Sequence, residues 1–307
     1  NKEKKLMENF KLSFTDSTVF TGKDLEGFYA QALLVGASKE SFRLIPDVKS
    51  TAKIAKLNLG SIVQDDSCSF AATGEGTLSQ KTVNAYDAKV NLQYCQKTWE
   101  QNYLSQVMRP GSSELMPATV ETWLVNEVSK KISNDLEYIV WQGSGATVAT
   151  NFVSENGLEA KLLADAGVID VSAVTLSASV IIAQLNRLYD AIPSTIKDSP
   201  ELVIYMNSKT AGFYKQAIAA TYTGYYTQEQ LLNFLGVRII VAGGMSDNKM
   251  VAAESNNFVL LTDIMSDFDD LLVLPLRSVT GAPVINFVCS FKFGVDFIYA
   301  NEIAYYN

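Results

Sequence analysis

The chain has 307 residues, of which 48% are hydrophobic and only 19% are charged, so it is long and apolar enough to bury a sizeable core. Its formal net charge of −8 argues against a protein that reads nucleic acid through clustered lysines and arginines. It contains no histidine, which excludes the Ser-His-Asp triad and every metal site that includes histidine.

Residues 1–49 predict an N-terminal arm of mixed structure. A helix is expected over 24–35, where Asp24 can act as the N-cap and apolar residues recur at three- and four-residue spacing. Extended chain should follow and end at Pro46, because the residue before a proline is driven away from helical geometry.

Residues 50–104 predict an extended loop built as a β-hairpin. Apolar and polar residues alternate over 54–63, a stretch rich in Asp, Ser and Gly follows, and alternation resumes between 83 and 94. A two-stranded hairpin is marginal by itself in water, so we expect this one to lie on a second copy of the chain. The residues expected to make that contact are Ile54, Leu57, Leu59, Phe70, Val83, Tyr86, Val90 and Leu92.

The strongest helix signal lies at 117–142, between Pro117, which suits a first turn, and Gly143, which suits a helix end. Such a helix would be about 40 Å long. Its length, next to a hairpin, favours a strut that supports the rest of the subunit; the alternative is an ordinary core helix of an α+β domain. The apolar stripe expected to pack on a sheet consists of Val120, Trp123, Leu124, Val128, Ile132, Leu136 and Ile139.

Residues 151–261 predict a compact unit of helices and strands. Helices are expected at 180–191 and 208–220, and buried strands at 202–205 and 237–241. A short helix is expected over 227–235, closed by Gly236. The segments 249–253 and 258–262 are expected to pair as strands, and the segment 271–307 is rich in further strands.

The residue types that carry chemistry are sparse. Cys68, Cys95 and Cys289 are too widely spaced for a zinc pair or a disulfide framework. The four aspartates between 263 and 270 miss the spacing of a calcium loop, so a solvated turn or helix cap is expected there, with an ion site as the alternative. No apolar run approaches the roughly 20 residues that cross a bilayer. We therefore expect no catalytic residues, no cofactor, no metal and no membrane segment.

In chain order, these elements resemble the Hong Kong 97-type fold of tailed-phage major capsid proteins. The strand at 90–94 followed by QKTWE at 96–100 resembles the family's exit from its extended loop. The helix end that runs into WQGSG at 141–145 resembles the end of its spine helix. The run LLNFLGVRI at 231–239, followed by 244–247 and 258–261, resembles the end of its axial domain.

The resemblance implies an α+β fold with four parts. These are an N-terminal arm (1–49), an extended loop (50–104), a peripheral domain (105–150 and 262–307) that holds the spine helix 117–142, and an axial domain (151–261). It implies a structural, non-enzymatic protein that assembles through pentamers and hexamers into the icosahedral shell around a double-stranded DNA genome.

The same resemblance implies partners and a location. The chain would contact copies of itself, a portal, scaffold or decoration proteins, and packaged DNA non-specifically, with assembly in the bacterial host cytoplasm and residence in the virion capsid. An encapsulin-like nanocompartment shell resembles the same fold and stays as an alternative. An enzyme or binding protein of unfamiliar type is the alternative from another class.

Overall fold

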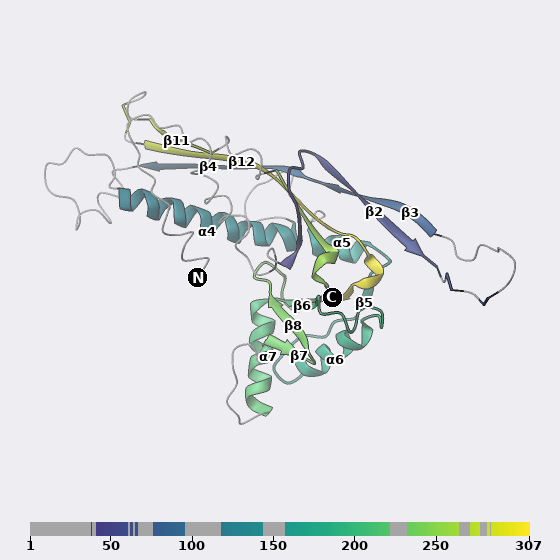
Figure 1. Cartoon of the computed structure of the whole chain (residues 1–307). Helices are drawn as coiled ribbons and strands as arrows, with labels where there is room; N and C mark the ends of the chain where they lie inside the picture. Colours follow the sequence, from purple (N-terminus) through teal and green to yellow (C-terminus); the bar gives the residue numbers. More distant parts are fainter. Residues whose placement is uncertain are drawn as a thin grey trace.

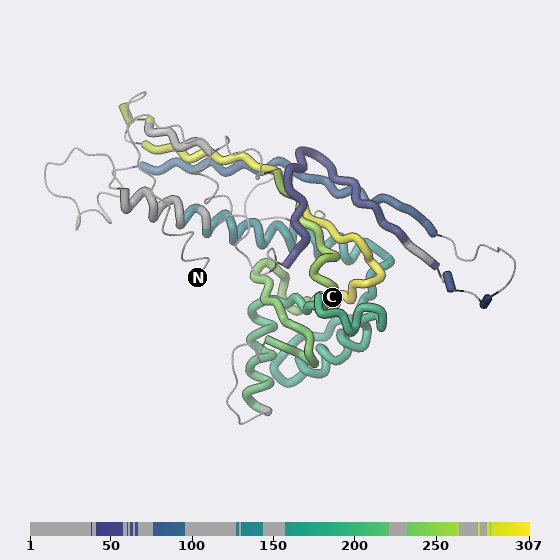
Figure 2. Tube along the Cα trace, viewed as in Figure 1, coloured from purple at the N-terminus to yellow at the C-terminus, as the bar shows by residue number. Residues whose placement is uncertain are grey.

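The computed structural model describes residues 38, 41–60, 62–63, 65–66, 76–95, 118–143, 157–221, 232–263, 271–276, 281–282 and 284–307. Figure 1 shows an elongated upper body, in which a long helix lies along a sheet, and a second body below it that is built around another sheet. A two-stranded hairpin projects sideways from the upper body (Figures 1 and 2). Of the helices in this part of the chain, none is long and apolar enough to cross a membrane.

The upper body is a five-stranded sheet organised around its longest strand, β12. β12 pairs antiparallel with β4, β11 and β10, and β1 adds to β10 in parallel. The strands are β1 (Arg43–Ile45), β4 (Tyr86–Cys95), β10 (Phe258–Thr262), β11 (Leu271–Pro275) and β12 (Val284–Phe297).

The helix α4 (Ala118–Gln142) confirms the predicted long helix and covers one face of this sheet (Figure 1). Its 25 residues correspond to about 37 Å. Val128, Ile132 and Leu136 are buried and Ile139 is half-buried, all in one core with the sheet. The other three residues of the predicted stripe lie on the helical backbone, but their side chains are outside the described set: Val120, Trp123 and Leu124.

The lower body is a six-stranded sheet in the order β5-β13-β9-β6-β8-β7. Its central strand β6 is buried on both faces: Val203 and Tyr205 join the core under α4, whereas Ile204 packs in a second core with α6 and α7. Its elements are β5 (Ile169–Val171), α6 (Ile181–Ala191), β6 (Leu202–Met206), α7 (Ser208–Thr221), β7 (Asn233–Phe234), β8 (Val237–Val241), β9 (Met250–Glu254) and β13 (Ala304–Tyr306). The short helix α5 (Leu158–Ala164) packs against α4 and β12 of the upper body.

The predicted pairing of 249–253 with 258–262 is wrong, because the chain changes sheets between these strands. The 3-10 turn η5 (Ser255–Asn257) carries it from β9 into β10, which pairs with β12 instead. The buried Asn257 side chain accepts the backbone N–H groups of Ile298 and Tyr299 and donates to the Tyr299 carbonyl. The predicted domain limits therefore do not coincide with sheet membership: β10 lies in the upper sheet, and β13 in the lower one.

A close backbone contact joins the end of α4 to the lower body. A Cβ atom added at Gly244 would lie 2.1 Å from the carbonyl oxygen of Glu137, so only glycine fits without movement. Next to it, the Gln142 side-chain amide donates to the Gly244 carbonyl at 2.7 Å. The two bodies therefore meet along a tightly packed seam.

Candidate assembly interface

The hairpin is formed by β2 (Thr51–Leu59) and β3 (Gly76–Asn84), which pair antiparallel along their whole length. Within the described residues, neither strand pairs with a third, so both edges of this two-stranded sheet are open. Figures 1 and 2 show the strands leaving the upper body and extending past α5. A hairpin is thus confirmed, but its return strand lies at Gly76–Asn84, and most of the alternating stretch expected to form it, 83–94, belongs to β4 instead.

The inner face of the hairpin is anchored to the body only near its base. Val83 is 1% exposed and packs with Val259, Leu261 and Ile298, and Ile54 is half-buried at the edge of the same cluster. The chain then turns at Ala85, whose N–H donates to the Ser50 carbonyl at 2.7 Å, and continues into β4. The base of the hairpin therefore belongs to the core of its own subunit.

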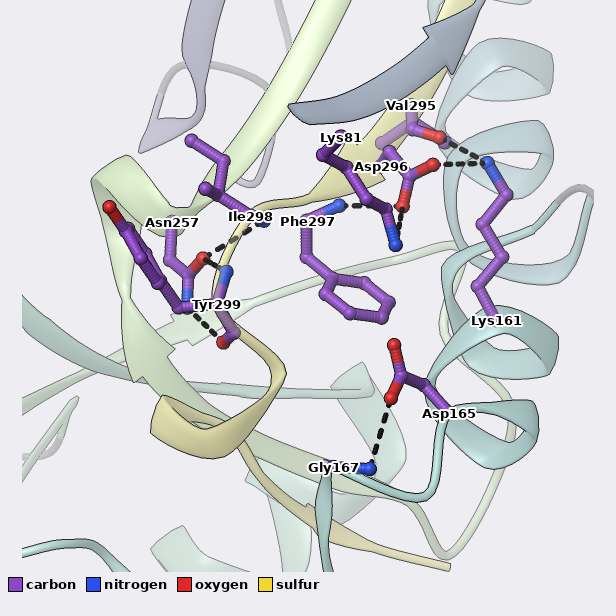
Figure 3. A network of polar contacts seen from close by, with 10 residues as sticks. All are labelled: Lys81, Lys161, Asp165, Gly167, Asn257, Val295, Asp296, Phe297, Ile298 and Tyr299. Atoms are coloured by element: carbon purple, nitrogen blue, oxygen red, sulfur yellow. Dashed lines mark hydrogen bonds and ion pairs between the residues drawn. The ribbon is translucent and has the colours of Figure 1, made fainter. Parts of the chain in front are cut away.

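A buried carboxylate adds a polar anchor at this base (Figure 3). Asp296 is shared by two lysines, with Lys161 Nζ on α5 3.3 Å from Oδ2 and Lys81 Nζ on β3 3.7 Å from Oδ1. Lys161 also donates to the Val295 carbonyl at 2.6 Å. Burial lowers the pKa of Lys161, and the charge of Asp296 opposes that shift. Lys81 lies 4.5 Å above the centre of the Phe297 ring, so this one residue ties β3 to β12 twice.

A polar cleft of about 910 Å³ separates the hairpin from the body beyond this anchor. Lys56 and Lys81 line it from the hairpin, and Glu254 and Glu302 line it from the body. Burial raises the pKa of the Glu302 carboxyl, and the neighbouring Glu254 charge raises it further. The hairpin is therefore not packed against its own subunit along its full length.

The outer face of the hairpin carries unusual apolar exposure. Leu57 and Leu78 lie directly opposite each other across the strands and are 52% and 72% exposed. Ile62 and Val63, just beyond the end of β2, are 59% and 88% exposed. A cluster of large apolar side chains left in water indicates a surface that another molecule covers. The other exposed large apolar residues are scattered over the rest of the described chain: Tyr138, Leu163, Val174 and Leu235.

The predicted contact residues divide into two groups. Leu57 lies on the exposed face and Ile54 at the half-buried base, whereas Val83 is internal. Tyr86, Val90 and Leu92 were expected on the hairpin but lie on β4, which pairs with β12, and they are half-buried against the core under α4. Their contact with another copy stays a prediction. The side chain of Leu59 and the whole of Phe70 lie outside the described residues.

The error over β4 has a simple cause. Period-2 alternation identifies a strand with one buried face, but it does not say which strand is its partner. β4 finds its partner about 200 residues further along the chain, at Val284 to Phe293. Leu78 was missed because no apolar residue flanks it within β3, although its register opposite Leu57 completes the exposed pair.

The described residues contain no group of three or more side chains that could hold a metal ion. Of the four aspartates between 263 and 270, only Asp263 is described, and its Oδ1 accepts the backbone N–H of Lys292 at 2.7 Å. This contact ties the residue that follows β10 to the middle of β12. The absence of a cofactor stays a prediction.

Comparisons with known proteins agree on the fold. No family model matches the sequence, and no curated protein matches it. The structure is similar to the capsid of an empty GTA particle, with a TM-score of 0.55 and 16% identity over 96% of this chain and 94% of that one. It is similar to the procapsid of satellite phage P4, with a TM-score of 0.57 and 10% identity over 92% and 97% of the two chains.

A virus-like particle from Pyrococcus furiosus is also similar, with a TM-score of 0.52 and 12% identity over 91% of this chain and 98% of that one. These similarities extend over nearly the whole of each chain. The chain therefore shares its overall fold with proteins of a capsid, a procapsid and a virus-like particle.

Proposed function

The chain has the Hong Kong 97-type capsid fold, and from that premise we propose that it is the major capsid protein of a tailed bacteriophage. Its function is mechanical: copies of the chain assemble through pentamers and hexamers into the icosahedral shell that encloses the double-stranded DNA genome. We propose that the chain is not an enzyme.

The observation that carries this proposal is the hairpin, which is fixed at its base and exposed beyond it. Val83 and the Lys81–Asp296–Lys161 contacts hold the base in the subunit. The paired leucines of the outer face and both strand edges are left open. When a rigid projection with an apolar face on one copy packs on a different surface of the next copy, the contact is heterologous. Such contacts form a ring when the rotation from copy to copy closes, as pentamers and hexamers require.

The two bodies have different proposed roles. The sheet covered by α4, with its continuous core, would be the stiff wall of the shell and the peripheral domain. The six-stranded body would be the axial domain, gathered at the centres of pentamers and hexamers. Many modest contacts per subunit then give high collective stability, because a subunit cannot leave without breaking several of them.

The remaining parts of the proposal follow from this role. The shell would receive a portal and interact with scaffold or decoration proteins, and packaged DNA would lie in its lumen without sequence-specific contacts. Assembly would take place in the cytoplasm of the bacterial host, and the mature location would be the virion capsid.

Expression of the full chain followed by light scattering and negative-stain microscopy tests the proposal. We expect closed particles of uniform diameter that elute far ahead of a 33.6 kDa monomer. Single chains at every concentration, with no particles on the grid, would instead favour an enzyme or binding protein of unfamiliar type.

A shell that encloses protein cargo is the second candidate, since a virus-like particle from Pyrococcus furiosus is among the similar structures and the fold is therefore not confined to phage capsids. The contents of particles isolated from their natural source separate the two. Nuclease-protected DNA supports the phage capsid, and a defined cargo protein with no DNA supports the compartment.

A further inference from the structure

The turn between β7 and β8 holds a leucine in a conformation that leucine disfavours. The two strands pair antiparallel, with Asn233 opposite Arg238 and Phe234 opposite Val237, so Leu235 and Gly236 are the two central residues of a tight hairpin. Both have positive φ, +49° and +89°. This is the geometry of a type I′ turn, for which Asn-Gly is the preferred pair and a leucine at the first position is strained.

The other described residues with positive φ are of types that tolerate this conformation, and Leu235 is not. Apart from glycines, the described residues contain only two more with positive φ, and these are Asp47 and Asn248. Aspartate and asparagine are the residues whose short polar side chains tolerate this region. Leu235 is therefore the one position of this kind where the residue does not match the backbone.

Packing within the subunit does not explain the leucine either. Leu235 is 63% exposed, whereas its neighbours Phe234 and Val237 are buried and supply the apolar contacts of the turn. The Phe234 ring packs against Tyr214, whose hydroxyl donates to the Asn233 carbonyl at 2.7 Å. Within the described residues, Tyr214 and the buried Phe234 and Val237 anchor the turn, while the Leu235 side chain is mostly in solvent.

A residue that neither the backbone nor the core favours points to a role outside the isolated subunit. We propose that Leu235 is an intersubunit contact whose side chain packs against a second copy of this chain in the assembled shell. This inference rests on the proposed function. A shell subunit is surrounded by copies of itself, so a contact at Leu235 would recur in every subunit. Its contribution to the stability of the shell would then grow with the number of subunits.

Three substitutions separate this role from a tolerated irregularity. Leu235→Asn relieves the backbone strain and removes the apolar side chain. Leu235→Ala keeps most of the strain and removes the side chain beyond Cβ. Leu235→Met keeps both strain and apolar bulk. The full-length proteins are compared by thermal unfolding below the concentration at which particles form, and by light scattering for the concentration at which they do.

The contact predicts opposite effects on stability and assembly. Leu235→Asn should raise the unfolding midpoint of the free subunit by about 2–4 °C. It should also raise the concentration needed for particles about tenfold. Leu235→Ala should impair assembly without the gain in midpoint, and Leu235→Met should resemble the wild type.

Two results would overturn the inference while leaving the proposed function intact: wild-type assembly by Leu235→Asn, or a lowered unfolding midpoint in that variant. If the wild-type chain forms no particles at all, the proposed function fails first, and this inference fails with it.

Discussion

Replacing the paired leucines of the hairpin with serine should block assembly without unfolding the subunit. Leu57 and Leu78 face each other on the outer side of β2 and β3, and neither belongs to a buried cluster of the described residues. Substitutions at such exposed positions usually change the free energy of unfolding by no more than about 0.5 kcal/mol. Any large effect of Leu57→Ser with Leu78→Ser must therefore come from a contact outside the subunit.

The exposed fractions of the two side chains set the size of the effect. Complete burial of a leucine is worth about 1.5–3 kcal/mol. Leu57 and Leu78 still have 52% and 72% of their surface to bury, so the pair can contribute about 2–4 kcal/mol to each hairpin contact. The double variant should then need a roughly 30- to 1000-fold higher concentration to form particles.

Light scattering against protein concentration measures this threshold, and urea unfolding checks that the subunit is intact. Leu163→Ser is the matched control, because Leu163 is 61% exposed but lies on the helix α5 and not on the hairpin. A double variant that assembles like the wild type would refute the reasoning, as would a control that loses assembly to the same extent.

Three further predictions concern the anchors inside the subunit. Asp296→Asn removes the charge that two lysines share and should lower the free energy of unfolding by about 1–3 kcal/mol, seen as a lower urea midpoint; an unchanged midpoint would contradict it. Gly244→Ala should lower the free energy of unfolding by about 1–3 kcal/mol or more, because the added Cβ would strike the Glu137 carbonyl. Gly243→Ala is the control and should leave the thermal midpoint nearly unchanged, since an added Cβ there meets nothing within 4 Å. Equal midpoints for the two variants would contradict the close contact between α4 and Gly244. The pKa of the Glu302 carboxyl is raised in the folded protein, so at pH values above 4.5, its usual pKa, the charged carboxylate lowers the free energy of unfolding. Glu302→Gln removes this charge and should therefore stabilise the protein at neutral pH. Solvent screening keeps that gain below about 1 kcal/mol, and unfolding curves should converge with the wild type below pH 4.5; a gain that persists there would be inconsistent with this cause.

Local signals predicted the elements whose formation depends on local sequence. The long helix was expected at 117–142 and is found at Ala118–Gln142, because a stripe of apolar residues between a proline and a glycine specifies both the helix and its ends. The outgoing strand β2 followed from its spaced apolar residues before a polar stretch, whereas the alternation at 83–94 that predicted the return strand falls mainly on β4. These features needed no knowledge of the rest of the chain.

Long-range pairing could not be predicted in the same way. β4 alternates cleanly between half-buried and exposed positions, but its partner β12 is distant in sequence, and nothing in either strand marks the other. The change of sheets at Asn257 was missed for the same reason, since β9 and β10 are adjacent in sequence and look like a pair. Sheet membership is decided by tertiary packing.

The turn at Leu235 was missed because Gly236 was read as the end of a helix. Glycine follows both a helix C-terminus and the first residue of a type I′ turn, so the glycine alone does not distinguish them. The structure instead has β7 at Asn233–Phe234 and a two-residue turn. The leucine at this position could point to an unusual turn only once the two flanking strands were known.

The most direct test of the central claim is an electron cryomicroscopy reconstruction of the assembled particles. We expect a closed shell in which the outer face of β2–β3, with Leu57 and Leu78, is covered by the neighbouring copy of the chain. A shell in which that face stays in solvent while other surfaces make all the contacts would contradict it.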